Sequence, residues 1–78
     1  MDRYRNFREV QATKIHDIVQ HPDGIFLIPQ DQMIGRIKVD RAFLASHQPS
    51  PGGYYVVKEN GIRCFIHATE FESEYRRV

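Results

Sequence analysis

Two adjacent tyrosines with two cations nearby are the residues of this sequence best suited to binding chemistry: Tyr54, Tyr55, Lys58 and Arg63. Neighbouring side chains on a strand point to opposite faces, so we expect one tyrosine in the core and the other outside. An exposed tyrosine beside Lys58 and Arg63 could stack on a base or hold a partner protein. The simpler interpretation is that both rings pack across strands of a thin sheet. The four residues form the predicted binding site.

The histidines lack the spacing of a metal site. His16 and His21 are five positions apart, which places them on no common helix face, and His47 and His67 are distant in the sequence. No CxxC, HxxxH or HExxH motif accompanies them. We therefore expect no metal and no other cofactor.

Groups for catalysis are equally sparse. On a helix Glu70 and Glu74 would share a face, where two carboxylates could act in acid–base chemistry. No companion nucleophile, oxyanion motif or phosphate loop occurs, so a solvated acidic face is the simpler interpretation. Cys64 lies in an apolar run and is expected in the core, where free cysteines usually reside. The sequence predicts a protein that is not an enzyme.

Arginines gather at both ends of the chain: Arg3, Arg5, Arg8, Arg76 and Arg77. If the termini pair side by side, these residues form one basic patch, which could bind phosphates or an acidic protein. The interpretation we prefer is a solvated rim, where charge protects an edge strand from aggregation.

The length of 78 residues predicts a single domain over residues 1–78 with a thin core. Hydrophobic residues make up 41% and charged residues 27%, which is typical of a globular chain and not of a disordered one. No apolar run is long enough to span a membrane, and the first residues lack the apolar segment of a signal peptide. We expect a cytoplasmic protein with no membrane partner, and the single cysteine allows no internal disulfide.

Alternating or wholly apolar runs predict strands, and the strands expected are residues 8–15, 24–28, 33–39, 54–59 and 62–66. Between the first two, Ile15, Ile18 and Val19 follow the i, i+3, i+4 spacing of a helix and predict one helical turn. The strongest local signal is Asn60-Gly61, which predicts a hairpin with a type I′ turn.

Two short helices are expected. Asp40 is a suitable N-cap for residues 41–46, which would bury Phe43 and Leu44. Thr69 and Glu72 match a capping box, and the turn that follows would carry Phe71 inward. We expect residues 75–78 to end the chain as a short strand or an extended tail. The fold class predicted is mainly β (β-rich α+β), a small barrel or a bent antiparallel sheet with one or two short helices.

The second half of the chain carries a family resemblance. Its segments are Pro51-Gly52-Gly53-Tyr54-Tyr55-Val56, Gly61-Ile62-Arg63-Cys64 and Phe71-Glu72-x-x-Tyr75-x-x-Val78. They resemble small phage and prophage proteins with a PGD[WY]-type hairpin and an FExxYxxV ending. Gly53 stands where that pattern has Asp. The resemblance implies a small binding protein in a bacterial host cell. Its partner would be a host protein of the defence or transcription machinery, which it blocks, or a small ligand.

A second resemblance lies earlier in the chain. Ile34-Gly35-Arg36-Ile37-Lys38-Val39, then Arg41-Ala42-Phe43-Leu44 and the Pro51-Gly52 turn, are similar to AbrB-like swapped-hairpin domains. Asp40 replaces the proline of that pattern, and the chain before Met33 has no counterpart. The resemblance implies a dimeric DNA-binding transcription regulator that uses Arg36, Arg41 and Lys38. We prefer the phage-type family, because its motifs extend to the last residue.

Overall fold

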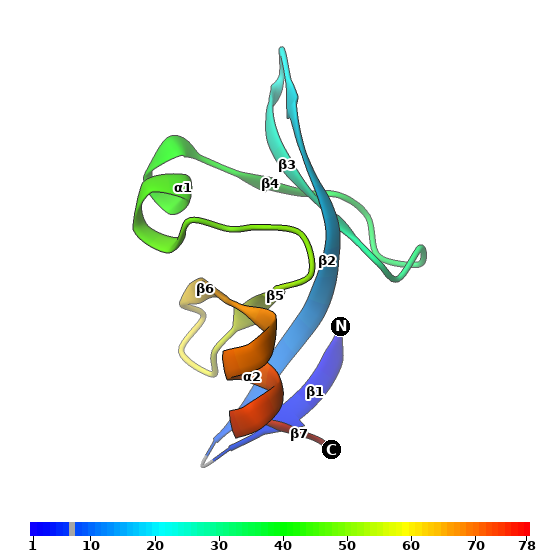
Figure 1. Ribbon diagram of the computed structural model, residues 1–78, viewed down its shortest axis with the longest axis vertical. Helices are drawn as coiled ribbons and strands as arrows, with labels where there is room; N and C mark the ends of the chain where they lie inside the picture. The colour runs from blue at the N-terminus through cyan, green and yellow to red at the C-terminus, as the bar shows by residue number, and fades with distance from the viewer. Residues whose placement is uncertain (7) are drawn as a thin grey trace.

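The chain is mainly β in the computed structural model, which describes residues 1–6 and 8–78 (Figure 1). Strands take up 47% of it and helices 18%, and the strand pairs of the described residues are antiparallel. The mainly β class predicted from the sequence is therefore confirmed. The elements in chain order are β1 (Asp2–Arg5), β2 (Glu9–His21), β3 (Gly24–Pro29), β4 (Ile37–Val39), α1 (Arg41–His47), β5 (Tyr54–Val57), β6 (Arg63–Ile66), α2 (Ala68–Glu74) and β7 (Arg76–Arg77).

The long strand β2 joins two parts of one bent sheet. Its first half lies between β1 and β5, since Gln11 pairs with Arg3 on one side and Val57 on the other. Its second half pairs with β3, and the register shifts between Ile15 and Asp17 where the partners change. A bulge of this kind bends a strand and increases its twist. The sequence predicted either a small barrel or a bent antiparallel sheet. The sheet does not close, so the bent antiparallel sheet is the one observed.

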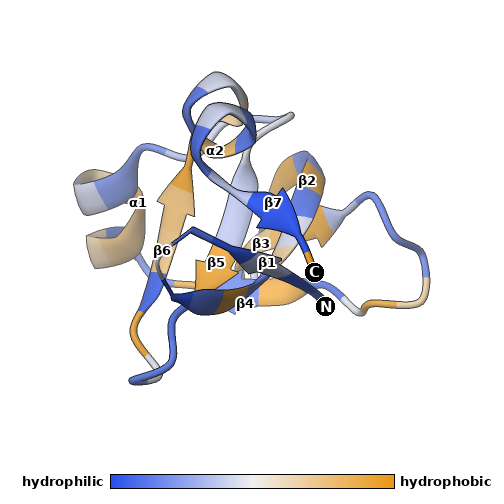
Figure 2. Cartoon of the chain, turned by 90° about the horizontal axis from the view of Figure 1, so that it is seen from below, coloured by the Kyte–Doolittle hydropathy of each residue, from blue (hydrophilic) through white to orange (hydrophobic). Residues whose placement is uncertain are grey.

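Both faces of β5 are covered by apolar side chains. Tyr55 faces a cluster built with Ile15, Ile25, Leu27, Val39 and Phe65, against which Phe43 and Leu44 of α1 pack. Tyr54 faces the opposite cluster, which contains Val10, Ala12, Val56 and Phe71 of α2. In Figure 2 most of the β6 ribbon and part of the β5 ribbon are hydrophobic, whereas β7 is strongly hydrophilic. The two short helices thus complete two small cores on opposite faces of the sheet.

Phe71 is the centre of an aromatic cluster that gathers distant parts of the chain. Its side chain is 1% exposed, and its ring stacks on Tyr54 with centroids 4.1 Å apart and on Tyr75 at 4.6 Å. Tyr4 of β1 meets the same ring edge-on at 4.8 Å. Aromatic pairs of this geometry contribute beyond the apolar area they bury. Phe71 therefore holds α2 against both the N-terminal strand and β5, and the expectation that it points inward is confirmed.

The two termini pair side by side, as the basic-patch hypothesis required. β7 is antiparallel to β1, with Tyr4 opposite Arg77 and Arg5 opposite Arg76. The expectation that the chain ends as a short strand is confirmed. The sequence does not predict β1, because Tyr4 is the only apolar residue of Asp2-Arg3-Tyr4-Arg5 and the alternation of a strand cannot be recognised from one residue.

Two expected elements differ in the structure. The predicted helical turn at Ile15, Ile18 and Val19 is wrong, because these residues continue β2, where β3 supplies backbone partners across the Pro22-Asp23 turn. The strand predicted over residues 33–39 is reduced to β4. Its first part is a polar turn in which the Met33 N–H donates to the Asp31 carboxylate at 2.9 Å, and the Met33 side chain is 92% exposed.

The hairpin at Asn60-Gly61 is confirmed, but its predicted type I′ turn is wrong. Val57 pairs with Arg63, the Lys58 N–H donates to the Ile62 carbonyl, and the Gly61 N–H donates to the Lys58 carbonyl, both at 2.9 Å. Only Gly61 of this loop has a positive φ, +83°. These features are typical of a three-residue loop in which a glycine forms a bulge.

One helix cap is confirmed and the other is not. The Phe43 N–H donates to the Asp40 carboxylate at 2.8 Å, as expected, and Phe43 and Leu44 are half-buried. α2 begins one residue before Thr69, its N-cap is His67 and no side chain caps it. The capping-box prediction was wrong because Thr69 already lies inside the helix. No helix of the described residues is long and apolar enough to cross a membrane.

Replacement of Phe71 by alanine tests the aromatic cluster. We expect Phe71→Ala to lower the free energy of unfolding by about 3–5 kcal/mol, the usual cost of truncating a buried phenylalanine. A chain of this size has about 4–12 kcal/mol in total, so the loss is a large part of its stability. Urea denaturation followed by circular dichroism measures the change. Met33→Ala is the control and should match the wild type, since Met33 is almost fully exposed. A loss below about 1 kcal/mol in Phe71→Ala would contradict the assignment.

Gly53 is required for packing. A Cβ at this position would lie 2.3 Å from Cζ of Phe65 and 3.0 Å from the Ile66 carbonyl oxygen. We expect Gly53→Ala to destabilise the fold by about 1–3 kcal/mol through overpacking. Gly35→Ala is the matched control, because a Cβ there meets no atom within 4 Å, and it should be nearly neutral. Equal urea midpoints for Gly53→Ala and Gly35→Ala would contradict this prediction, because the Phe65 ring would then move aside without loss of stability.

Candidate functional site

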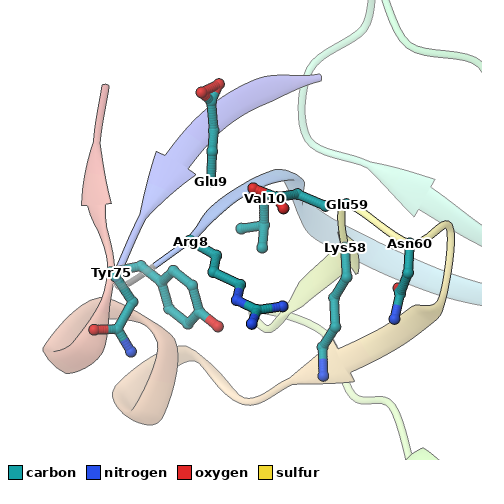
Figure 3. A pocket seen from close by; sticks show the side chains of 8 residues that line it. Arg8, Glu9, Val10, Lys58, Glu59, Asn60 and Tyr75 are labelled. Atoms are coloured by element: carbon teal, nitrogen blue, oxygen red, sulfur yellow. The ribbon is translucent and has the colours of Figure 1, made fainter.

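A cleft of about 660 Å³ opens where the β1–β2 connection, the β5–β6 loop and the end of α2 meet (Figure 3). This volume is within the range of small-molecule sites. Buried Val10 contributes an apolar surface, and the rest of the lining is polar or aromatic. The lining residues are Asn6, Arg8, Glu9, Val10, Lys58, Glu59, Asn60 and Tyr75.

Two cations and a tyrosine share this cleft. Figure 3 shows the side chains of Arg8 and Lys58 extending to the same side as the Tyr75 ring, whereas Glu9 points the other way. Glu9 accepts from Arg3 at 3.2 Å, so its charge is already matched. Within the described part of the chain, neither Arg8 nor Lys58 has a carboxylate within ion-pair distance. Glu59 is a second carboxylate of the lining and is exposed, so the cleft has two cations and two carboxylates. Arg8 and Lys58 can thus contact a ligand as individual charges, while the lining as a whole has no net charge.

Tyr75 is positioned by the aromatic cluster. Phe71 covers one face of its ring, with an angle of 11° between the ring planes, and the residue is half-buried at the cleft. Burial raises the pKa of Tyr75, and the charges of Cys64, Glu74 and Glu70 add to the effect. The hydroxyl is therefore neutral at physiological pH and can donate a hydrogen bond.

The four residues of the predicted binding site do not come together. Tyr54 and Tyr55 are only 7% and 4% exposed, so the expectation that one of them faces outward is wrong. The reason is that α2 covers one face of β5 and α1 the other, a burial that alternation along one strand does not reveal. Lys58 lines the cleft, while Arg63 lines a separate hollow of about 510 Å³ together with Lys38.

The cations of the predicted DNA-binding set have different surroundings. The Arg36 guanidinium lies over the Phe26 ring at 4.1 Å, which is a cation–π contact within the chain. Lys38 is an exposed residue of β4 beside the hollow that Arg63 also lines. Arg41 is the exposed first residue of α1. Arg36 is therefore partly engaged, while Lys38 and Arg41 are accessible.

The histidine, serine and cysteine side chains considered for catalysis are not among the residues that line the cleft. The Ser50 hydroxyl is 3.4 Å from Nδ1 of His67, at an exposed position. Cys64 is half-buried, and burial raises the pKa of its thiol, an effect that Lys58 opposes. Among residues 1–6 and 8–78 no group of three or more histidine, cysteine or acidic side chains could hold a metal ion.

Sequence reasoning missed the roles of Arg8 and Tyr75. The sequence places Arg8 only in the hypothetical basic patch and Tyr75 only in a family motif. Both reach the cleft because β7 pairs with β1 and Tyr75 packs on Phe71. The sequence signal that could have indicated the site is the group of arginines at both ends of the chain. If the termini are assumed to pair, Arg8 and Tyr75 come to the same end of the sheet.

No family model, curated protein or solved structure matches the chain. The two resemblances drawn from short motifs therefore stay predictions. What the cleft can do follows from its own lining: two cations, two carboxylates of which Glu9 is paired with Arg3, a neutral phenol, two amides and an apolar surface. An anionic group could contact Arg8 and Lys58, and a flat or apolar part of the ligand could contact Val10 and Tyr75.

The buried tyrosine beside the site gives the protein a pH-dependent stability. The Tyr54 hydroxyl donates to Oε2 of Glu72 at 2.8 Å, and the Lys14 ammonium is 3.6 Å from the same oxygen. Burial, the hydrogen bond to Glu72, the charge of Glu72 and the neighbouring Tyr4 raise the pKa of Tyr54 from 10.0 to about 12. A raised pKa means that the folded state holds the proton more tightly than the unfolded state.

We expect the stability contributed by Tyr54 to be complete below pH 10 and lost as the pH rises toward 12. Tyr54→Phe removes this dependence and, near neutral pH, costs about 0.5–1.5 kcal/mol for the lost hydrogen bond. Urea denaturation of both proteins across this pH range provides the measurement. Other groups titrate in both proteins and cancel in the difference. The account is wrong if the wild type and Tyr54→Phe lose stability in parallel above pH 10.

Proposed function

We propose that this chain is a small binding protein that holds an anionic group of its partner in the cleft between Arg8, Lys58 and Tyr75. The observation that carries the proposal is that Arg8 and Lys58 have no carboxylate within ion-pair distance among the described residues. They share the cleft with a neutral tyrosine and an apolar surface, and Glu9 of the lining is paired with Arg3. Hydrogen bonds between arginine or lysine and an oxyanion are among the strongest that proteins make.

Binding suits this cleft better than catalysis. Arg8 and Lys58 provide charge, the Tyr75 hydroxyl and the side chains of Asn6 and Asn60 provide hydrogen bonds, and the cleft lining includes no histidine, cysteine or serine. These three residue types are common acid–base or nucleophilic groups, and the other candidates of the lining, Glu9, Glu59, Lys58 and Tyr75, make no hydrogen bond to one another among the described residues. The proposal is thus a protein that recognises its ligand and releases it unchanged.

The motif resemblance supports a phage or prophage origin for this binding protein. Its partner would then be a host protein whose surface it blocks, or a small ligand, and either could present the anion. The alternative of a dimeric AbrB-like DNA-binding regulator draws less support, because the Arg36 guanidinium is held over the Phe26 ring. Lys38 and Arg41 would have to supply most of its phosphate contacts.

Titration with pyrophosphate tests the cleft as an anion site. We expect addition of inorganic pyrophosphate to shift the amide resonances of residues 58–61 and Tyr75 in two-dimensional NMR spectra. Hydrogen bonds to charged groups contribute about 1.5–3 kcal/mol, so Arg8→Gln and Lys58→Gln should each weaken the affinity about 10- to 100-fold.

Arg41→Gln is the matched control, because it removes an exposed cation at another site and should leave the affinity unchanged. The proposal fails if pyrophosphate shifts no cleft resonance at millimolar concentration. It also fails if all three variants weaken binding equally, since that result would indicate attraction by net charge alone.

A further inference from the structure

Charges of both signs lie in the cleft without forming ion pairs with one another. Glu59 lines it together with Arg8 and Lys58. Among residues 1–6 and 8–78, no nitrogen of either cation is within 4.0 Å of a Glu59 oxygen, and Glu59 has no other cationic partner. Glu9 differs, because its carboxylate is paired with Arg3. The cleft therefore presents two cations and one carboxylate that a ligand could contact.

The opposite charges of the β5–β6 loop leave it in different directions. Figure 3 shows the Glu59 side chain reaching toward β2, where Val10 lies, while the Lys58 side chain extends another way. Glu59 is exposed and also borders a second hollow of about 470 Å³, so it lies at the rim of the cleft. Two opposite charges that share a cleft and stay apart leave a place for a ligand that contacts both.

The rest of the lining adds an apolar and aromatic surface. Val10 is 5% exposed, and Tyr75 is half-buried with one ring face covered by Phe71. Side chains of this kind hold a ring or a branched apolar group of a ligand. The amides of Asn6 and Asn60 can hydrogen bond with a charged group of either sign. The lining thus offers three kinds of contact: cationic, anionic and apolar.

We propose that the cleft binds a free amino acid with an aromatic or branched apolar side chain. Its carboxylate contacts Arg8 and Lys58, and its ammonium group contacts Glu59 at the rim. Its side chain packs on Val10 and Tyr75. This inference rests on the proposed function, with the carboxylate as the anionic group, and adds the class of ligand.

Ligands with charge of one sign match this lining less well. A simple anion leaves the Glu59 carboxylate unmatched and is repelled by it, and a simple cation is repelled by Arg8 and Lys58. A zwitterion has no net charge, as the lining has none, and it can pair with both signs. An amino acid carries the carboxylate, the ammonium group and the apolar side chain on one carbon, so a single small ligand makes all three contacts.

Titration with L-phenylalanine and its blocked derivatives tests the inference. We expect L-phenylalanine to shift the amide resonances of residues 58–61 and Tyr75 in two-dimensional NMR spectra. N-acetyl-L-phenylalanine lacks the ammonium charge and L-phenylalaninamide lacks the carboxylate, so each should bind about 10- to 100-fold more weakly. Glycine retains both charges without a side chain and should also bind more weakly, because it loses the contact with Val10 and Tyr75.

Two variants that remove one negative charge each separate the inference from the proposed function. Glu59→Gln should weaken L-phenylalanine binding about 10- to 100-fold and should not weaken the binding of pyrophosphate. Glu9→Gln is the matched control and should leave both affinities unchanged, because Glu9 is paired with Arg3 and points away from the cleft cations in Figure 3.

The inference fails if L-phenylalanine shifts no cleft resonance, if N-acetyl-L-phenylalanine binds as tightly as L-phenylalanine, or if Glu59→Gln retains full affinity for the amino acid. It also fails if the dipeptide glycyl-L-phenylalanine, whose two charges lie on different residues, binds more tightly than the free amino acid. In each of these cases the proposed function stands as long as pyrophosphate binds the cleft. If neither pyrophosphate nor L-phenylalanine binds, both fail together.

Discussion

The burial of Phe71 is the interaction on which the rest of the structure depends. A chain of 78 residues buries a smaller share of its surface than a larger domain, so few side chains carry its cohesion. Phe71 is nearly inaccessible to solvent and contacts the rings of two distant strands, Tyr4 in β1 and Tyr54 in β5, as well as Tyr75 at the end of its own helix. One ring therefore holds α2 against the first strand of the chain and against β5.

The candidate site is a consequence of that packing. Stacking on Phe71 fixes the ring of Tyr75, and the residues that follow it pair with β1 as β7. The same arrangement brings Arg5 beside Arg76, while the β5–β6 loop places Lys58 in the cleft with Arg8. A binding site holds its geometry when its side chains are anchored by packed neighbours. The aromatic cluster supplies that anchor here, although it lies under the cleft and not in it.

Local features of the sequence predicted local features of the fold. Asp40 was recognisable as a cap because its carboxylate needs only a backbone N–H a few residues away. The hairpin at Asn60-Gly61 and the buried run that forms β3 were recognisable for the same reason. The turn type was not, because Asn60-Gly61 suits both a two-residue loop and the glycine bulge that is present.

Features that depend on distant partners could not be predicted. Ile18 and Val19 have helical spacing, yet pairing with β3 keeps them in an extended strand. Tyr54 and Tyr55 are adjacent on a strand and point to opposite faces, so one of them was expected to be exposed. Helices cover both faces of β5, and both rings are buried. The site combines Arg8, Lys58 and Tyr75, which are far apart in the sequence and meet only through the sheet and the aromatic cluster. The chemistry of each residue was visible, but their proximity was not.

The most direct test of this account is the pyrophosphate affinity of Phe71→Leu, measured by amide shifts at a temperature where the variant is folded. Leucine retains apolar volume but cannot stack on Tyr75, so the account predicts weaker binding even though Phe71 is not among the residues lining the cleft. Wild-type affinity in a folded Phe71→Leu would contradict it, because the cleft would then keep its geometry without the aromatic anchor.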